Sequence, residues 1–205
     1  MTQSSKPRPI VIGALVAGLI SISAPVTFAQ EPAGNIDETC SSFGYVTTGL
    51  SHRTYQIEPS TGKNQMVVDR YTHRSTGEIA TLDAFGFNTK DAHLYAWDHN
   101  YKRPVRINQS GGVDIIPVEG APNTTFYAGD ISLNPNRYYV YRPGTAYGLY
   151  YLDLDKDSGN YGKLYRVKGS EHLDISISDF AFHPSDGFAY AVDIDGDVFL
   201  SLIHI

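Results

Sequence analysis

The stretch Leu82-Asp-Ala-Phe-Gly-Phe-Asn-Thr-Lys-Asp-Ala-His-Leu-Tyr-Ala-Trp-Asp98 decides the fold of this chain, because it recurs. Phe85 and Phe87 alternate with small residues, polar residues supply a turn, and a second β-prone run follows, so two strands are predicted. The pattern returns at Asp179-Phe-Ala-Phe-His-Pro-Ser-Asp-Gly-Phe-Ala-Tyr-Ala-Val-Asp193, and a weaker copy covers residues 130–141. The chain is therefore built from repeats.

Further equivalent positions extend the repeat to four units. Tyrosines recur at intervals of 50, 46 and 49 residues, and aliphatic residues at intervals of 50 and 47, each followed five residues later by glycine. These residues are Tyr45, Tyr95, Tyr141 and Tyr190; Ile57, Ile107 and Leu154; and Gly62, Gly112 and Gly159. Each unit holds about four short strands without helical periodicity, which is typical of β-propeller blades. We therefore predict an all-β fold, a propeller of four-stranded blades with repeats of 46 to 50 residues.

The first 29 residues have the order of a secretory signal peptide. Lys6 and Arg8 precede an apolar run from Ile10 to Ile22, and small residues follow up to Ala29. An uncleaved anchor is the alternative, although the run is shorter than the roughly 20 apolar residues that span a membrane. We expect a secreted, periplasmic or cell-surface protein in which residues 30–42 form a polar linker.

The last six residues, Leu200-Ser-Leu-Ile-His-Ile205, resemble the translation of a transposase adapter used to prepare sequencing libraries. We therefore expect the true sequence to stop near Phe199, inside a strand. On this interpretation residues 43–199 form a truncated partial propeller of about three blades and the start of a fourth. Such a fragment is expected to be an open arc with two unpaired strand edges that aggregates when expressed alone.

Composition limits the partners. Loss of Lys6 and Arg8 with the signal peptide changes the net charge from −6 to −8, and no basic patch suited to nucleic acid is present. The single cysteine, Cys40, cannot form an internal disulfide, so it is either buried or paired with a cysteine in a missing part of the protein. Contact with a membrane is expected only through the signal peptide or through missing C-terminal domains.

Two aspartates occupy the same place in the repeat. Asp130 and Asp179 each begin a predicted innermost strand, where the second unit has Ala84 with Asp83 beside it. Because inner strands line the central channel of a propeller, these carboxylates could hold a hard cation such as Ca²⁺. The alternative is that each aspartate caps backbone N–H groups at the entrance of its blade.

A second candidate metal site is the turn that contains Asp153, Asp155 and Asp157, which are spaced as in a calcium loop. The turn departs from the EF-hand pattern at Ser158 and Leu164, where that pattern has Gly and Glu. A solvated acidic turn is the alternative. No cofactor is required by the sequence, and Ca²⁺ is the one ion that it suggests.

No catalytic signature is present. The histidines have no metal-binding spacing, and no Gly-x-Ser-x-Gly motif occurs. The abundant tyrosines could form a face that binds carbohydrate or protein, or could pack between blades. They include Tyr138, Tyr139, Tyr141, Tyr147, Tyr150 and Tyr151.

The series Phe87-Asn-Thr-Lys-Asp-Ala-His-Leu-Tyr-Ala96, Arg106-Ile107 and Ser110-Gly-Gly-Val113 resembles bacterial extracytoplasmic propellers related to the NHL and YVTN repeat groups. It is also similar to an uncharacterised domain family of secreted and envelope proteins, and the resemblance covers residues 43–199. It implies a propeller without assigned chemistry, in groups used for adhesion, scaffolding and sometimes catalysis.

The predicted function is therefore a secreted or envelope-associated, non-catalytic binding or scaffolding module with an unidentified protein or carbohydrate ligand. The alternative is a propeller enzyme, a metal-dependent hydrolase or lactonase, with carboxylates lining its channel. A third interpretation is a spacer that precedes further domains.

Overall fold

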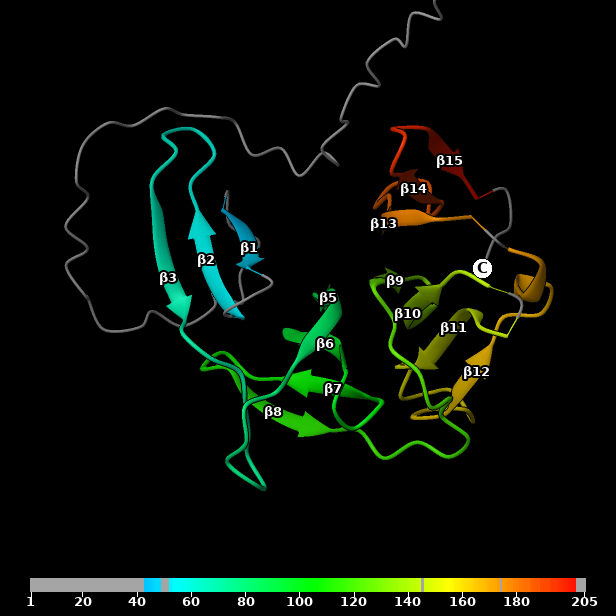
Figure 1. Cartoon of the computed structure of the whole chain (residues 1–205), viewed down its shortest axis with the longest axis horizontal. Helices are drawn as coiled ribbons and strands as arrows, with labels where there is room; N and C mark the ends of the chain where they lie inside the picture. The colour runs from blue at the N-terminus through cyan, green and yellow to red at the C-terminus, as the bar shows by residue number, and fades with distance from the viewer. Residues whose placement is uncertain (1–42, 49–51, 145, 174, 202–205) are drawn as a thin grey trace, which may run out of the picture.

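The computed structural model describes residues 43–48, 52–144, 146–173 and 175–201, and these residues form strands, turns and one 3₁₀ helix of three residues. The expected all-β architecture is therefore confirmed. Four small sheets follow one another along an arc in chain order, coloured from cyan to red in Figure 1. Each sheet corresponds to one unit of the repeat and is called a blade below. The signal peptide, the linker with Cys40 and residues 202–205 lie outside the described part.

Blade 1 consists of β1 (Gly44–Thr48), β2 (Arg53–Ile57) and β3 (Asn64–Val68). Blade 2 consists of β4 (Thr72–His73), β5 (Leu82–Asn88), β6 (His93–Asp98), β7 (Arg103–Ile107) and β8 (Gly112–Ile115). Blade 3 consists of β9 (Ala128–Leu133), β10 (Asn136–Arg142), β11 (Gly148–Asp153) and β12 (Leu164–Arg166). The 3₁₀ helix η1 (Ser170–His172) leads to blade 4, with β13 (Ile177–Phe182), β14 (Ala189–Asp193) and β15 (Val198–Leu200).

Consecutive strands pair antiparallel within each blade, and only the short β4 joins its sheet in parallel, beside β8. The edge strands β5 of blade 2, β9 of blade 3 and β13 of blade 4 lie next to one another: β5 contacts β9, and β9 contacts β13. These three strands lie on the inner side of the arc (Figure 1). This arrangement of neighbouring meanders is that of propeller blades.

Hydrophobic side chains fill the spaces between successive blades. Between blades 2 and 3, Trp97 and Phe126 meet edge to face with their ring centroids 4.6 Å apart, and both are fully buried. The Trp97 indole Nε1 donates a hydrogen bond of 2.9 Å to the Thr124 carbonyl oxygen, so its one polar group is satisfied. Burial of large side chains such as these contributes roughly 1.5–3 kcal/mol each.

Small residues let the inner strands approach closely. A Cβ atom on Gly129 of β9 would lie 2.6 Å from the Ala84 carbonyl oxygen of β5. The same oxygen accepts a hydrogen bond of 2.6 Å from the Tyr138 hydroxyl. Contact between β5 and β9 therefore depends on the absence of a side chain at Gly129.

Strand register corrects one of the predicted sets of equivalent residues. Phe87 faces Leu94 with six residues between them, but Leu133 faces Asn136 with only two residues between them. Between these equivalent positions the β9–β10 hairpin is therefore four residues shorter. Arg137, rather than Tyr141, therefore occupies the place of Tyr95 in blade 3. The placement of Tyr141 among the equivalent tyrosines was wrong, because equal spacing along the chain concealed the shorter turn.

Within the part of the chain that the structure describes, no helix is long and apolar enough to cross a membrane.

Candidate functional site

The antiparallel order of the strands places two kinds of connection on one side of the molecule. The β6–β7, β10–β11 and β14–β15 turns lie on the same side as the connections from β3 to β5, β8 to β9 and β12 to β13. We call this side the loop face. The inner strands begin at this side, so their first residues lie close to it.

Three aspartates occupy equivalent positions near the start of the inner strands. Asp83 lies opposite Trp97, Asp130 opposite Tyr139 and Asp179 opposite Val192. In each blade this opposite residue is the third after the one that faces Phe87, Leu133 or Phe182. The equivalence of Asp130 and Asp179 is confirmed. The assignment of Ala84 to this position was wrong, because a bulge in β5 follows Asp83 and places Ala84 one residue later, with φ at 55°.

The carboxylates of these aspartates accept hydrogen bonds from backbone N–H groups. Asp130 Oδ2 accepts a bond of 2.7 Å from the Phe182 N–H, which belongs to the next blade. Asp179 Oδ1 accepts one of 2.9 Å from the Phe180 N–H of its own strand, and the Gly129 backbone of blade 3 acts to lower the pKa of Asp179. Blades 3 and 4 are thus joined by the Asp130 side chain.

The surroundings of the inner strands disfavour charge on these groups. Desolvation raises the pKa of Asp83 and Asp130, and it raises the pKa of Asp179 to about 6. The neighbouring carboxylates of Asp130 and Asp83 add to the rise at Asp179. His99 and His52 act in the opposite direction on Asp83. The three carboxylates are therefore near enough to influence one another.

The structure does not bring the second candidate site together with the first. Asp153 ends β11, and Asp155 and Asp157 follow in the β11–β12 turn, on the side opposite the loop face. Asp153 Oδ1 accepts the Asp155 N–H at 2.9 Å, and Asp155 Oδ1 accepts the Asp157 N–H at 3.1 Å. These bonds are those of Asx turns. Among the described residues, no group of three or more His, Cys, Asp or Glu side chains is placed to hold a metal ion.

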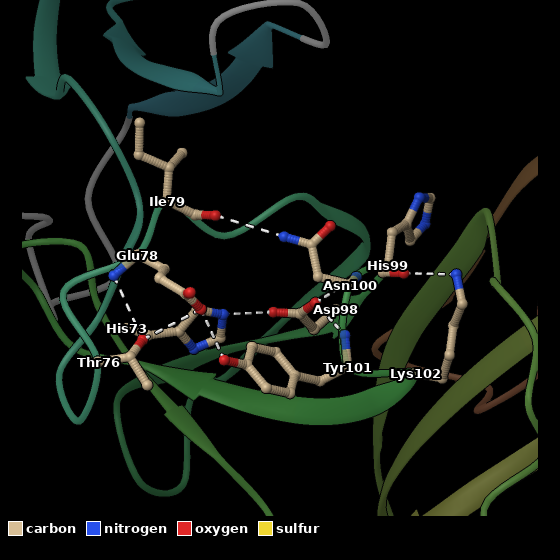
Figure 2. A network of polar contacts seen from close by, with 9 residues as sticks. All are labelled: His73, Thr76, Glu78, Ile79, Asp98, His99, Asn100, Tyr101 and Lys102. Carbon is tan, nitrogen blue, oxygen red and sulfur yellow. Dashed lines mark hydrogen bonds and ion pairs between the residues drawn. The ribbon is translucent and has the colours of Figure 1, made fainter.

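A buried histidine–aspartate pair fixes the connection between blades 1 and 2 (Figure 2). His73 Nε2 lies 2.7 Å from Asp98 Oδ2, and the two side chains are 1% and 0% exposed. Asp98 Oδ1 also accepts the N–H groups of Asn100 and Tyr101, at 2.6 and 2.9 Å. Because the pair is closed to solvent, we interpret it as structural. Sequence analysis missed it, since the two residues share no motif.

A second cluster on the loop face surrounds Arg142 at the end of β10. Its guanidinium carbon lies 4.4 Å from the centre of the Tyr147 ring and 5.5 Å from that of Tyr127. Its Nη1 donates to the hydroxyl of Thr124, and to that of Thr125 at 3.2 Å. Tyr127 is 49% exposed. The cluster combines a cation, two rings and hydroxyl groups at the surface.

Other tyrosines from the same set pack between blades. Tyr138, Tyr139 and Tyr141 are almost fully buried, which confirms the packing interpretation for these three. The Arg142 cluster could not be found from the sequence, because its members come from the β8–β9 connection and the β10–β11 turn.

The model of one repeat family matches residues 45–202, which is most of the chain. The chain belongs to the DUF6923 family. This family is described as a repeat of unknown function. Membership confirms the repeat architecture and the resemblance to an uncharacterised family, and it assigns no chemistry. No curated protein matches the chain.

The chain is similar to solved structures at low sequence identity. A chain of the nidogen/laminin complex aligns with a TM-score of 0.53 and 10% identity, over 78% of this chain and 56% of that chain. A protein of unknown function from Bacteroides thetaiotaomicron aligns with a TM-score of 0.49 and 16% identity, over 77% of this chain and 44% of that one. The chain thus spans about half the length of the structures it matches. The repeat family and the likeness to the chain of the nidogen/laminin complex show the β-propeller fold.

Proposed function

We propose that this chain is a secreted or envelope-associated module that binds or scaffolds and does not catalyse a reaction, and that the loop face is its binding surface. The observation that carries the proposal is the bond from the Phe182 N–H of blade 4 to Asp130 of blade 3. The Asp130 carboxylate, a candidate metal ligand of the channel wall, thereby joins two blades. The order of residues 1–29 supports export, and fractionation of cells producing a tagged full chain tests it.

An isosteric pair of variants separates this role from a metal site. Asp130→Asn keeps an oxygen that accepts the Phe182 N–H, whereas Asp130→Ala leaves that N–H without a partner. We expect Asp130→Ala to lower the free energy of unfolding by about 1–3 kcal/mol, and Asp130→Asn to preserve it. The measurement is urea unfolding of the full chain, combined with calorimetric titration of Ca²⁺.

A metal-dependent enzyme gives a different pattern. Loss of a carboxylate ligand would abolish Ca²⁺ binding equally in Asp130→Asn and Asp130→Ala. Observation of Ca²⁺ binding in the unchanged chain, with loss in both variants, would contradict the proposed role.

One observation favours the enzyme alternative, a hydrolase or lactonase with channel-lining carboxylates. A pKa of about 6 places Asp179 near the range in which a carboxylate acts as a general base at neutral pH. The test is turnover of a panel of lactones and glycosides, with and without Ca²⁺. Turnover that disappears in Asp179→Asn would establish the enzyme, and the binding proposal predicts none.

A further inference from the structure

We propose that Arg142 and the two tyrosine rings beside it bind the carboxylate of a uronate sugar in an acidic polysaccharide. This inference rests on the proposed function, because it names a ligand class for the same loop face. The observation that supports it is the set of contacts that the Arg142 guanidinium group makes with tyrosine rings and threonine oxygens.

The Arg142 side chain is fixed in one orientation. Tyr147 and Tyr127 lie against the guanidinium group, at 4.4 and 5.5 Å from its carbon to the ring centres. Within the described residues, all of its hydrogen bonds leave from Nη1, to the hydroxyls of Thr124 and Thr125 and to the Thr125 carbonyl oxygen. The Nε and Nη2 groups remain as a planar pair of donors, the arrangement that binds a carboxylate with two hydrogen bonds.

Basic side chains of the neighbouring blade lie on the same face as Arg142. The β6–β7 turn places His99, Lys102 and Arg103 in the blade next to Arg142, and the His99 ring packs against Tyr127 with centroids 5.9 Å apart. The same turn also meets carboxylates, because Asp98 Oδ1 accepts the N–H groups of Asn100 and Tyr101, and Asp83 lies within the influence of His99. In a chain with a net charge of −6, the Arg142 guanidinium group and these basic side chains are what attracts an anion to this part of the loop face.

Rings and hydroxyls beside the guanidinium group favour a sugar. The ring of Tyr127 is half exposed, and its hydroxyl lies 3.0 Å from Thr125 Oγ1. A tyrosine offers an apolar face and a polar edge, which match the C–H face and the hydroxyls of a pyranose. Acidic peptide motifs are commonly bound by clusters of arginines, whereas this cluster offers a single guanidinium group between two rings. We therefore favour a uronate sugar.

The experiment is calorimetric titration of the full chain with oligosaccharides of galacturonate, of alginate and of hyaluronate. Methyl-esterified oligogalacturonate is the matched neutral probe, and dextran sulfate reports attraction to any polyanion. We expect at least one uronate oligomer to bind, and its esterified or neutral form to bind at least about tenfold more weakly, the loss expected for a hydrogen bond to a charged group.

Variants locate the site. Arg142→Gln should weaken uronate binding about tenfold or more, and Arg142→Lys should also weaken it, because a lysine lacks the planar pair of donors. Arg106→Gln, at an exposed arginine near the end of β7 and away from the loop face, is the control and should bind as the unchanged chain does. Thermal unfolding of each variant verifies that it is folded, and Arg142→Lys serves if Arg142→Gln does not fold.

Three results would overturn the inference: no binding of any uronate, equal binding of the esterified probe, or binding unaffected by Arg142→Lys and Arg142→Gln. A fourth result would also reject it: dextran sulfate binds more tightly than any uronate oligomer, and its affinity is unchanged in the Arg142 variants. Each of these leaves the binding proposal intact, because another ligand could occupy the loop face. Turnover of lactones or glycosides would instead reject the proposed function itself.

Discussion

Asp130, Asp179 and Asp83 illustrate what can be predicted for single residues. The repeat in the sequence predicts that Asp130 and Asp179 are equivalent, because the same strand pattern follows both. In the second unit the sequence predicted Ala84 at this position, one residue after Asp83, because a β-bulge cannot be recognised from the spacing of residues along the chain. The bond from the Phe182 N–H to Asp130 could not be predicted either, because it joins residues 52 positions apart.

Asp179 should make stability depend on pH. Its pKa in the folded chain, about 6, lies above its ordinary value of 3.8, so the folded state binds the proton more tightly between these values. The contribution of this group to stability therefore falls as the pH rises from 4 to about 6. We expect Asp179→Asn to reduce the loss of stability between pH 5 and pH 7.5, as measured by urea unfolding.

Asp186→Asn is the control for this experiment. The pKa of Asp186 is lowered, chiefly by the hydrogen bond from the Phe188 N–H, so this carboxylate is ionised in both states above pH 5. Its removal should leave the difference between pH 5 and pH 7.5 unchanged. If both substitutions changed the difference in unfolding free energy between pH 5 and pH 7.5 equally, the pKa of Asp179 would not be raised by its surroundings.

The buried pair of His73 and Asp98 predicts a large stability effect. His73→Ala removes the partner of a carboxylate that is 0% exposed, and we expect a loss of about 3–5 kcal/mol in the free energy of unfolding. His172→Ala, at a side chain that is 84% exposed, should change it by less than about 0.5 kcal/mol. Similar midpoints for both variants in chemical denaturation would mean that the pair does not hold the connection between blades 1 and 2.

At the scale of elements, turn length explains why the strands could be predicted from the sequence whereas their register could not. In blades 2 and 4 the longer hairpin contains the same contact, from the Tyr95 hydroxyl to Asp91 at 2.6 Å and from the Tyr190 hydroxyl to Asp186 at 3.0 Å. The shorter β9–β10 turn leaves no place for this contact. Strand existence was predictable from alternation, and register was not, because it depends on the turn.

Close approach of β5 and β9 predicts the effect of adding one methyl group. Gly129→Ala would place a Cβ atom 2.6 Å from a backbone oxygen of Ala84, so the inner strands must separate. We expect a loss of about 1–3 kcal/mol, typical of an overpacked core. Gly159→Ala, where nothing lies within 4 Å of the added atom, is the matched control for thermal unfolding. Unchanged stability of Gly129→Ala would contradict the packing of these strands.

At the scale of the whole molecule, the repeat alone was sufficient to predict a propeller. Residues that recur every 46 to 50 positions cannot be explained by a single sheet. The surface was not predictable, because Arg142, Tyr127 and His99 meet only when turns of neighbouring blades are brought side by side. The fold therefore follows from periodicity, and the candidate binding face follows from the packing of one blade on the next.

A channel-wall carboxylate, that of Asp130, joins blades 3 and 4. Hydrogen exchange of the Phe182 backbone amide, measured by NMR on the full chain, tests it most directly, because this N–H donates to Asp130. We expect slow exchange in the unchanged chain and in Asp130→Asn, and markedly faster exchange in Asp130→Ala. Exchange of the Phe182 amide that is equally fast in all three proteins, while amides within the β13–β14 ladder stay protected, would contradict the account.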